Sequence, residues 1–349
     1  MYSSDGVTVL GAGVAGATFS YLARRKGIEV NAYDVTQHYA KPCGEAIPSW
    51  VTRLLGEYGI PLPRVIEEVK LFSIYNYRGE LVRRIDFNKA IWYIINKAEW
   101  IDRIRSAIGV KPVDYGFMNI ACRSAGLVFD ARGPFSSEGA KIVVWQADME
   151  NIVGVSEESI QVIDFSKGPG LVWVFSKGDM LNIGGGFYGE TNPRARSIRL
   201  INKVLNTKDV EKHILREKYS ILTLVPELRI AERNCIRLGE SAGLIMSLGG
   251  EGIRPALLSA LYAYKSLENN GDSVFFDLAR YHRYLVPVIH QVRLNKLIFR
   301  LGAILGQGFV EKVLRNIDEN MLEEWFSGNL GLKTRLAETL YRVLKIIIH

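Results

Sequence analysis

One stretch near the start of the chain decides its fold: Val7-Thr-Val-Leu-Gly11-Ala-Gly13-Val-Ala-Gly16. The apolar run before the glycines predicts a strand, and a segment with helical spacing follows them to about Lys26. A second apolar run, from Ile28, then ends in the acid Asp34. This order of strand, turn, helix and strand predicts the start of a doubly wound α/β sheet.

The three glycines have separate tasks in such a turn. Gly11 permits the tight turn off the strand, Gly13 lets backbone approach a pyrophosphate, and Gly16 allows close packing of helix on strand. The helix N-terminus offers N–H groups and a positive dipole to phosphates. Asp34 stands where a carboxylate accepts hydrogen bonds from a ribose. The pattern therefore predicts a dinucleotide site, without distinguishing FAD from NAD.

Further along the chain the pattern predicts a second sheet. We expect a hairpin over residues 71–87 and antiparallel strands near 141–145, 159–164, 171–175 and 180–183. Residues 126–130 resemble a further strand of the first sheet, and helices are expected at 92–108, at 195–216 and from 251 onward. We predict a discontinuous first domain (1–70, 90–140 and 228–270), a β domain (71–89 and 141–227) and a C-terminal helical region (271–349).

Composition narrows the class of protein. Apolar residues make up 48% and charged residues 23%, the balance of a folded globular chain. A net charge of +7 fits an anionic cofactor or surface, and we expect no nucleic-acid partner. No apolar run reaches the roughly 18 residues of a membrane span, and no secretion signal is visible. We expect a cytoplasmic protein, with peripheral contact at the inner face of the cell membrane as an open alternative.

The cysteines and histidines indicate no metal site. Cys43, Cys122 and Cys235 contain no CxxC pair, and their odd number argues against a secreted disulfide framework. The last two adjoin predicted strands, so we expect them to be packing residues. The five histidines have no metal-ligand spacing, and we expect no metal.

A second glycine-rich segment lies late in the chain. Arg237-Leu-Gly-Glu-Ser-Ala-Gly243 precedes Gly249-Gly-Glu-Gly-Ile253 and an apolar helix. An acid after a strand can reach a cofactor's sugar-alcohol chain, and the glycines let a helix N-terminus approach an electron-rich group. A glycine loop before a core helix is the alternative. Together with the first motif, this arrangement is what a flavin requires.

Several segments, taken in chain order from residue 7 to about 265, resemble the geranylgeranyl reductase family. They are residues 11–16, Asp34, Lys41-Pro-Cys-Gly-Glu-Ala46, Asp130-Ala-Arg-Gly133, Gly239-Glu-Ser-Ala-Gly243 and Gly252-Ile253. The family belongs to the glutathione-reductase-like FAD enzymes of hydroxybenzoate-hydroxylase type and saturates isoprenoid double bonds of archaeal lipids or chlorophyll side chains. The resemblance implies a glutathione-reductase-type, FAD-binding Rossmann-like domain, an inserted antiparallel-sheet substrate domain and a C-terminal helical segment.

Carried over by position, the resemblance also implies a set of FAD-binding residues. Lys97 stands where the family usually has Arg, and Glu240 where it usually has Asp. Gly252 and Ile253 would offer backbone N–H groups to the flavin. The full set is Gly11, Gly13, Ala15, Gly16, Asp34, Pro42, Cys43, Glu45, Lys97, Ala121, Asp130, Gly239, Glu240, Gly250, Gly252 and Ile253.

Cys43, with Gly44 beside it, is the candidate catalytic position. A thiol next to a flavin can position an alkene or help to deliver a proton. The alternative is a small, buried and inert cysteine.

The family's substrate motif, PxxYxWxFP, is partly kept. Trp173 and Phe175 match, whereas Leu171 replaces the tyrosine and both prolines are absent. Alternate residues of one strand share a face, so both rings can flank an apolar chain. Ordinary sheet core is the alternative, and the departures leave the exact substrate open. The nearby Gly184-Gly-Gly186 is expected to be a strand end, because no periodic helix follows it.

The sequence thus predicts an FAD-dependent oxidoreductase that reduces C=C bonds of isoprenoid lipids by hydride transfer from reduced flavin. A flavin monooxygenase or a lycopene-cyclase-like enzyme with an apolar substrate is one alternative, and a non-catalytic lipid-binding or electron-transfer flavoprotein is another. The electron donor, a ferredoxin or NADPH, is open, as are isoprenoid length, head group, general acid and oligomeric state. For the apolar helical patterns at 294–310 and 336–348 we expect packing on the flavin domain, with lipid contact as the alternative.

Overall fold

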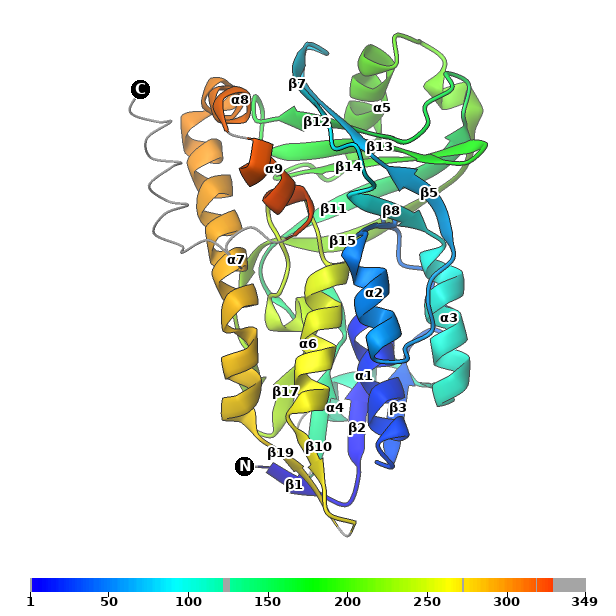
Figure 1. Cartoon of the computed structure of the whole chain (residues 1–349), viewed down its shortest axis with the longest axis vertical. Coiled ribbons are helices and arrows are strands. Elements are labelled where there is room, and N and C mark those ends of the chain that lie inside the picture. The colour runs from blue at the N-terminus through cyan, green and yellow to red at the C-terminus, as the bar shows by residue number, and fades with distance from the viewer. Residues whose placement is uncertain (1, 122–125, 272, 318, 329–349) are drawn as a thin grey trace.

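The structure is a computed structural model that describes residues 2–121, 126–271, 273–317 and 319–328. Two large sheets with their helices lie one above the other along the long axis of the molecule, and helix α7 (Leu278–Leu305) runs beside both (Figure 1). The lower sheet has six strands and the upper sheet has seven.

The six-stranded sheet has the order β16-β17-β10-β2-β3-β9 and is parallel except for β16. In β10, Leu127 and Phe129 are buried in one core, while Val128 is buried in another. Burial on both faces is typical of a parallel sheet covered by helices. The predicted Rossmann-like α/β fold is confirmed. The bounds are β2 (Val7–Leu10), β3 (Val30–Asp34), β9 (Lys111–Pro112), β10 (Leu127–Asp130), β16 (Ala231–Glu232) and β17 (Cys235–Arg237).

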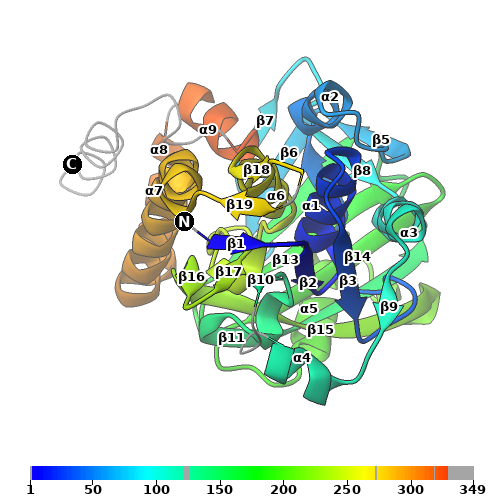
Figure 2. The same ribbon diagram turned by 90° about the horizontal axis from the view of Figure 1, so that it is seen from below.

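Helices cover both faces of this sheet. Helices α1 (Val14–Arg25), α3 (Lys97–Ile108) and α6 (Ile253–Lys265) share the larger core on one face. Helix α4 (Tyr115–Ala121) covers the other face through Met118 (Figure 2). The N-terminus of α1 therefore lies at the carboxyl end of β2, where a dinucleotide turn belongs.

The seven-stranded sheet has the order β15-β11-β14-β13-β12-β6-β7. Its neighbours are antiparallel except for the β12/β6 pair. Helix α5 (Pro193–Val204) packs on one face and buries Ile198 and Ile201 there. The bounds are β6 (Leu71–Asn76), β7 (Leu81–Asp86), β11 (Glu138–Glu150), β12 (Glu158–Asp164), β13 (Gly170–Lys177), β14 (Met180–Phe187) and β15 (Ile214–Glu227).

The three glycines of β14 make room on both faces of this sheet. A Cβ on Gly184 would stand 2.2 Å from the Trp173 ring, and one on Gly185 would stand 2.4 Å from Ser197 Oγ of α5. The glycines thus let an indole lie flat on one side of the strand and a helix approach closely on the other.

Two small sheets and short helices complete the connections. One sheet has the order β4-β8-β5 and the other β1-β19-β18. The bounds are β1 (Tyr2–Ser4), β4 (Ala46–Pro48), β5 (Val65–Val69), β8 (Trp92–Ile95), β18 (Leu267–Asn269), β19 (Val274–Phe276), α2 (Trp50–Glu57), and the 3₁₀ turns η1 (Gly133–Phe135), η2 (Val210–His213) and η3 (Gly239–Ala242).

The last described helices cover the second face of the seven-stranded sheet. After α7 come α8 (Gln307–Asn316) and α9 (Glu319–Phe326), and we call these three the covering helices. Leu314 and Phe326 share a core with Phe72 of β6, and Leu285 of α7 packs with the core of α6. Packing of 294–310 on the flavin domain was expected, but Leu294 packs with Phe72 and Phe175, and Phe299 packs with Ile142 and Leu224, so this segment covers the seven-stranded sheet instead. Residues 336–348 lie outside the described residues. In the described ranges, no helix combines the length and apolar character that crossing a bilayer requires.

Two local predictions of secondary structure were wrong. Residues 92–95 form β8, and the helix starts only at Lys97, where Asn96 Oδ1 accepts a bond from the Glu99 backbone N–H. The helix expected over 195–216 ends at Val204, because residues 214–227 pair with β11 as a long strand. Cys235 is 4% exposed and packs in a core with Leu10 and Val128, as predicted, and it is also disulfide-bonded. Cys122 lies outside the described residues.

The strands predicted at 71–87, 126–130, 141–145, 159–164, 171–175 and 180–183 are observed as β6, β7, β10, β11, β12, β13 and β14. The six-stranded sheet uses only residues between 7 and 237 that were assigned to the first domain, and the seven-stranded sheet uses residues 71–86 and 138–227. The domain limits themselves stay a prediction.

Candidate functional site

The turn between β2 and α1 requires its glycines for steric reasons. Gly11 has φ +90°, and a Cβ there would stand 2.5 Å from the Ala131 carbonyl oxygen. A Cβ on Gly16 would stand 1.8 Å from the Gly11 carbonyl oxygen. A Cβ on Gly13 would meet only a ring carbon of Tyr39, at 3.6 Å. Gly11 and Gly16 are thus fixed by packing, whereas Gly13 faces open space.

This open space lies at the N-terminus of α1. Gly13 and Ala15 line a cavity of about 770 Å³, and among the described residues no side chain caps the helix. The unpaired N–H groups and the helix dipole favour an anion at this position. We call residues 10–16 together with Asp34 the cradle.

Asp34 is held in the cradle by two donors. Its Oδ2 accepts a bond of 2.7 Å from the Ala12 N–H and one of 3.0 Å from Arg105 Nη1. Arg105 is 3% exposed and also donates to the carbonyl oxygens of Ala12 (3.2 Å) and Thr36. Arg105 was not predicted from the sequence. A signal existed, because this cation lies on the apolar face of α3 beside Ile101 and Ile108.

Residues 41–45 form the next wall of the cavity, and all of them line it. The Cys43 carbonyl accepts a bond of 3.0 Å from Asn182 Nδ2, and the Glu45 N–H donates to Cys43 Sγ at 3.3 Å. Cys43 is a free thiol. Glu45 has φ +59°, which is unusual for a residue with a side chain, and its carboxylate pairs with Lys177 of β13. The segment is therefore held in a strained conformation between the two sheets.

Lys97 lies directly under this segment. It is 3% exposed, donates a bond of 3.0 Å to the Lys41 carbonyl and faces the Tyr39 ring with its ammonium 5.1 Å from the centroid. Burial opposes its charge, but Cys43, Tyr39 and Glu45 outweigh burial and hold the pKa of Lys97 above its ordinary value. Lys97 therefore places a permanent positive charge behind Cys43.

Glu240 reaches the cavity from η3. Its Oε2 is 2.7 Å from Lys41 Nζ, and its Oε1 accepts a bond of 2.8 Å from the Thr223 N–H. Gly252 is the residue before α6, and Ile253 begins this helix. Both line the cavity, so a second helix N-terminus faces the same space as the cradle.

Three predicted FAD-binding residues do not line the cavity: Gly16, Asp130 and Gly239. Gly239 packs between α1 and α6, where its Cβ would stand 3.2 Å from Ala15 and 3.1 Å from Ala256. Ala121 is the last residue of α4, and its side-chain surroundings lie outside the described residues. Predicted site residues that do line the cavity are Gly11, Gly13, Ala15, Asp34, Pro42, Cys43, Gly44, Glu45, Lys97, Trp173, Phe175, Glu240, Gly250, Gly252 and Ile253.

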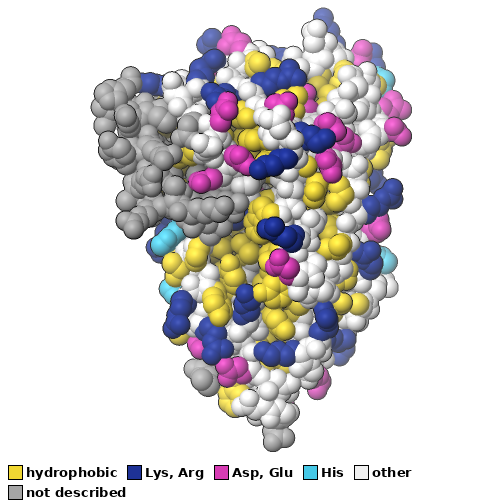
Figure 3. All heavy atoms as spheres, in the orientation of Figure 1, with side chains coloured by type: hydrophobic (Ala, Val, Ile, Leu, Met, Phe, Trp, Pro, Cys, Tyr) yellow, Lys and Arg dark blue, Asp and Glu magenta, His cyan; other side chains and the backbone are white. Residues whose placement is uncertain are grey.

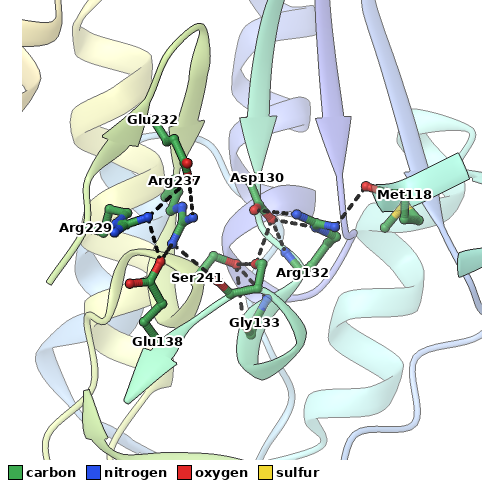
Figure 4. Close-up of polar contacts among 10 residues, drawn as sticks. Met118, Asp130, Arg132, Gly133, Glu138, Arg229, Glu232, Arg237 and Ser241 are labelled. Carbon is green, nitrogen blue, oxygen red and sulfur yellow. Dashed lines mark hydrogen bonds and ion pairs between the residues drawn. The ribbon is translucent and has the colours of Figure 1, made fainter. Parts of the chain in front are cut away.

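Asp130 instead organises the loop after β10 (Figure 4). Its carboxylate is 1% exposed, forms an ion pair of 2.9 Å with Arg132 and accepts a bond of 2.9 Å from Ser136 Oγ. Arg132 also donates to the Met118 carbonyl, and Ser241 Oγ accepts a bond of 2.7 Å from the Gly133 N–H. Figure 4 shows this network joining α4, β10 and η3. Asp130 therefore shapes the wall of the cavity without lining it.

The cavity continues as an apolar space beneath the seven-stranded sheet, which we call the chamber. Trp173 and Phe175 project from one face of β13 with ring centroids 6.4 Å apart. A Cβ on Gly44 would stand 2.6 Å from the Phe175 ring, so the rings contact the cysteine segment directly. The covering helices supply the opposite wall, with Ile298, Phe299, Val310, Leu314 and Phe326.

No protein-family model and no curated protein sequence matches this chain. Solved structures match it in fold. A geranylgeranyl bacteriochlorophyll reductase-like protein from Thermoplasma acidophilum is 17% identical, with 97% of this chain and 98% of that chain covered and a TM-score of 0.73. A flavoprotein/dehydrogenase from Cytophaga hutchinsonii is 13% identical, with 99% of each chain covered and a TM-score of 0.66.

A probable FAD-dependent monooxygenase from Pseudomonas aeruginosa is 16% identical, with 94% of this chain and 99% of that chain covered and a TM-score of 0.57. Because these sequence identities are low, the similarity shows that the folds are alike and nothing more. The chain has the fold of FAD-binding flavoproteins, and its predicted resemblance to geranylgeranyl reductases is confirmed at that level.

Proposed function

We propose that this chain is an FAD-dependent oxidoreductase that reduces C=C bonds of isoprenoid chains. One observation carries the proposal: a single cavity joins the cradle to the apolar chamber, and Cys43 lies between them. A cradle alone fits many nucleotide enzymes, and a chamber alone fits many lipid binders. Their junction at a thiol and two aromatic rings supports a redox reaction on an apolar substrate.

The residues present fit FAD. The cradle offers an uncapped helix N-terminus for a diphosphate, and Asp34 lies beside it for a ribose. Glu240 and the N-terminus of α6 lie further along the same cavity, where a sugar-alcohol chain and a flavin ring would be held. Bound FAD in its reduced form would supply the hydride.

The protein's own part is orientation and exclusion of water. Trp173 and Phe175 present one apolar face on which a flat alkene can lie against residues 43–44. The covering helices keep the chamber apolar. Cys43 is the proposed catalytic residue, which positions the alkene or delivers the proton, and the buried charge of Lys97 stabilises developing negative charge nearby.

The test is an anaerobic incubation of the FAD-loaded, dithionite-reduced protein with a geranylgeranyl lipid. Reduction predicts oxidation of the flavin together with a gain of two hydrogen atoms per double bond, read by mass spectrometry. A product that forms only with oxygen would indicate a monooxygenase, and an isomeric product would indicate a cyclase-like enzyme. Unchanged lipid would leave an electron-transfer or lipid-binding protein and would refute the proposal.

The proposal also includes an external electron donor, a ferredoxin or NADPH. The second glycine cluster, residues 184–186, lies inside β14 and packs against Trp173 and α5, so it is not available as a nucleotide turn. Stopped-flow mixing with reduced ferredoxin or with NADPH, followed at the flavin absorbance, identifies the donor. A flavin that stays oxidised with both would refute this part.

Peripheral membrane contact is the last part of the proposal. Apolar side chains gather over α6 on the face in Figure 3, with Lys and Arg side chains around them. Tyr284 of α7 is 37% exposed and contacts α6, since its ring centroid lies 5.7 Å from that of Tyr262 and 5.9 Å from the ammonium of Lys265. Such a surface is typical of proteins that bind anionic bilayers. Cosedimentation with phosphatidylglycerol vesicles but not with phosphatidylcholine vesicles is the expected result.

A further inference from the structure

The wall that α7 contributes to the cavity carries two buried amide side chains, Gln291 and Asn295. Their exposed fractions are 1% and 4%, and both residues line the cavity. They are four residues apart and therefore share one face of the helix. Within the described part of the chain, Gln291 Nε2 and Asn295 Oδ1 have no hydrogen-bond partner. Buried polar atoms without a partner are rare, and such atoms at a cavity wall indicate a ligand.

The orientation of both amides is fixed by their other bonds. Gln291 Oε1 accepts a bond of 2.8 Å from Arg254 Nη1, and Asn295 Nδ2 donates a bond of 2.9 Å to the Gln291 carbonyl. Turning either amide over would break these bonds. The wall therefore offers one unpaired N–H donor and, one helical turn away, one unpaired carbonyl acceptor.

The charge beside this pair is balanced. Arg254 is 2% exposed and binds Glu251 through Nε at 2.7 Å and Nη2 at 3.0 Å. Its guanidinium group therefore already bonds to the carboxylate of Glu251 and to the side chain of Gln291. A phosphate or diphosphate has unprotonated oxygens that only accept, so it would leave Asn295 Oδ1 unpaired and would meet Glu251 at close range. A hydroxyl group both accepts and donates, and it carries no charge.

We propose that Gln291 and Asn295 form a polar subsite for the hydroxyl group of an isoprenoid alcohol. Gln291 Nε2 donates a hydrogen bond to the hydroxyl oxygen, and Asn295 Oδ1 accepts a hydrogen bond from the hydroxyl group. Ile298 and Phe299 follow on the next turn of α7 and line the chamber, so the apolar chain continues along the same wall. This proposal rests on the proposed function, which supplies the isoprenoid chain of the substrate. It adds that the head group of the substrate is a hydroxyl group.

The test compares binding of geranylgeraniol and of geranylgeranyl diphosphate by wild type and two variants, with tryptophan fluorescence as the readout. We expect wild type to prefer the alcohol. Asn295→Leu removes the acceptor, and Gln291→Glu removes the donor while keeping an acceptor for Arg254. Each is expected to weaken alcohol binding about tenfold, the effect of one lost hydrogen bond at the upper end of its usual range. Asn316→Leu, the same change on the exposed face of α8, is the control and should leave binding unchanged.

Thermal unfolding of the ligand-free variants gives a second readout that does not depend on binding. Because Asn295→Leu removes an unpaired buried acceptor, it is expected to leave Tm unchanged or to raise it by a few degrees. A wild type that binds the diphosphate as tightly as the alcohol, or variants that bind the alcohol like wild type, would overturn the proposal. A fall in Tm with unchanged binding would mean that bound water satisfies these atoms, which also overturns it. Failure of the proposed function is a separate result, since it appears as unchanged lipid after incubation with reduced flavin.

Discussion

The cradle and the chamber are parts of one cavity, yet they are built in opposite ways. In the cradle, backbone segments pack so closely against one another that only glycine, which has no side chain, fits at positions such as Gly11 and Gly16. The chamber consists of large side chains from β13 and from the covering helices, such as Trp173 and Phe326, which are far apart in the sequence. The first part depends on exact backbone geometry, and the second depends on total volume and apolar character. Substitutions should therefore separate the two parts, and the following experiments test this in order of decreasing effect.

Arg105→Met should have the largest effect. The change leaves the carboxylate of Asp34, 15% exposed, without its buried partner, and such losses cost about 3–5 kcal/mol of unfolding free energy. FAD affinity should fall as well, because Arg105 also holds the Ala12 carbonyl. Urea unfolding and flavin titration measure both quantities. Arg53→Met, which breaks an exposed pair with Glu57, is the control and should stay within about 0.5 kcal/mol of wild type.

Gly16→Ala should come next. The added methyl would meet the Gly11 carbonyl oxygen at 1.8 Å, so the turn must move, at a cost of about 3 kcal/mol. Material that folds should be colourless after incubation with FAD. Gly13→Ala, with only a 3.6 Å contact, should keep its Tm but bind FAD more weakly, because the methyl enters the ligand space. Equal Tm values for Gly16→Ala and wild type would contradict the steric account of the cradle.

Phe175→Leu in the chamber should be milder. The ring is 6% exposed and the change conserves apolar character, so a loss of about 1 kcal/mol is expected. Binding of an isoprenoid should weaken, whereas FAD affinity should not change. Fluorescence titration with each ligand makes the comparison. A parallel loss of FAD affinity would show that the two parts of the cavity are not independent.

Lys97→Met tests the charge behind Cys43, and its effect should be visible as a pH dependence of stability. The pKa of Lys97 is raised in the folded protein, so its charge stabilises the fold at every pH below the ordinary lysine pKa. This contribution is lost only as pH rises through the higher folded pKa. The difference in unfolding free energy between wild type and variant should be constant from about pH 6 to about pH 9 and shrink in stronger alkali. A difference that disappears near neutral pH would mean that Lys97 is not charged in the fold.

The cradle could be predicted from the sequence because its requirements are local. Gly11, Gly16 and Asp34 act within one strand–helix–strand unit, and their spacing carries the steric information. Arg105 could not be predicted as the partner of Asp34, since the pair forms only after α3 packs beside β3. The pairing of Glu45 with Lys177 could not be predicted either, because the two residues are 132 positions apart in the sequence and no local pattern indicates their contact.

In the chamber, residues could be predicted where the pattern of a single strand determines their position. They could not be predicted where contacts between several segments determine it. Alternation along β13 placed Trp173 and Phe175 on a common face. The first three residues of β15, Ile214–Arg216, were assigned to a helix, because the charged residues at the start of this strand mask its alternation until pairing with β11 is known. Gln291 and Asn295 were not predicted from the sequence. An amide side chain on a helix indicates a binding site only when the structure shows that it is buried.

Two indole N–H groups fasten the end of α9 to the rest of the molecule: Trp50 donates to the Ser327 carbonyl at 2.6 Å, and Trp92 donates to the Phe326 carbonyl. Both tryptophans come early in the chain, whereas α9 is made last among the described elements. During synthesis on the ribosome, both sheets and the turn between β2 and α1 can therefore form while the wall formed by the covering helices is still missing. The wall that these helices give to the chamber is therefore the last part of the cavity to form.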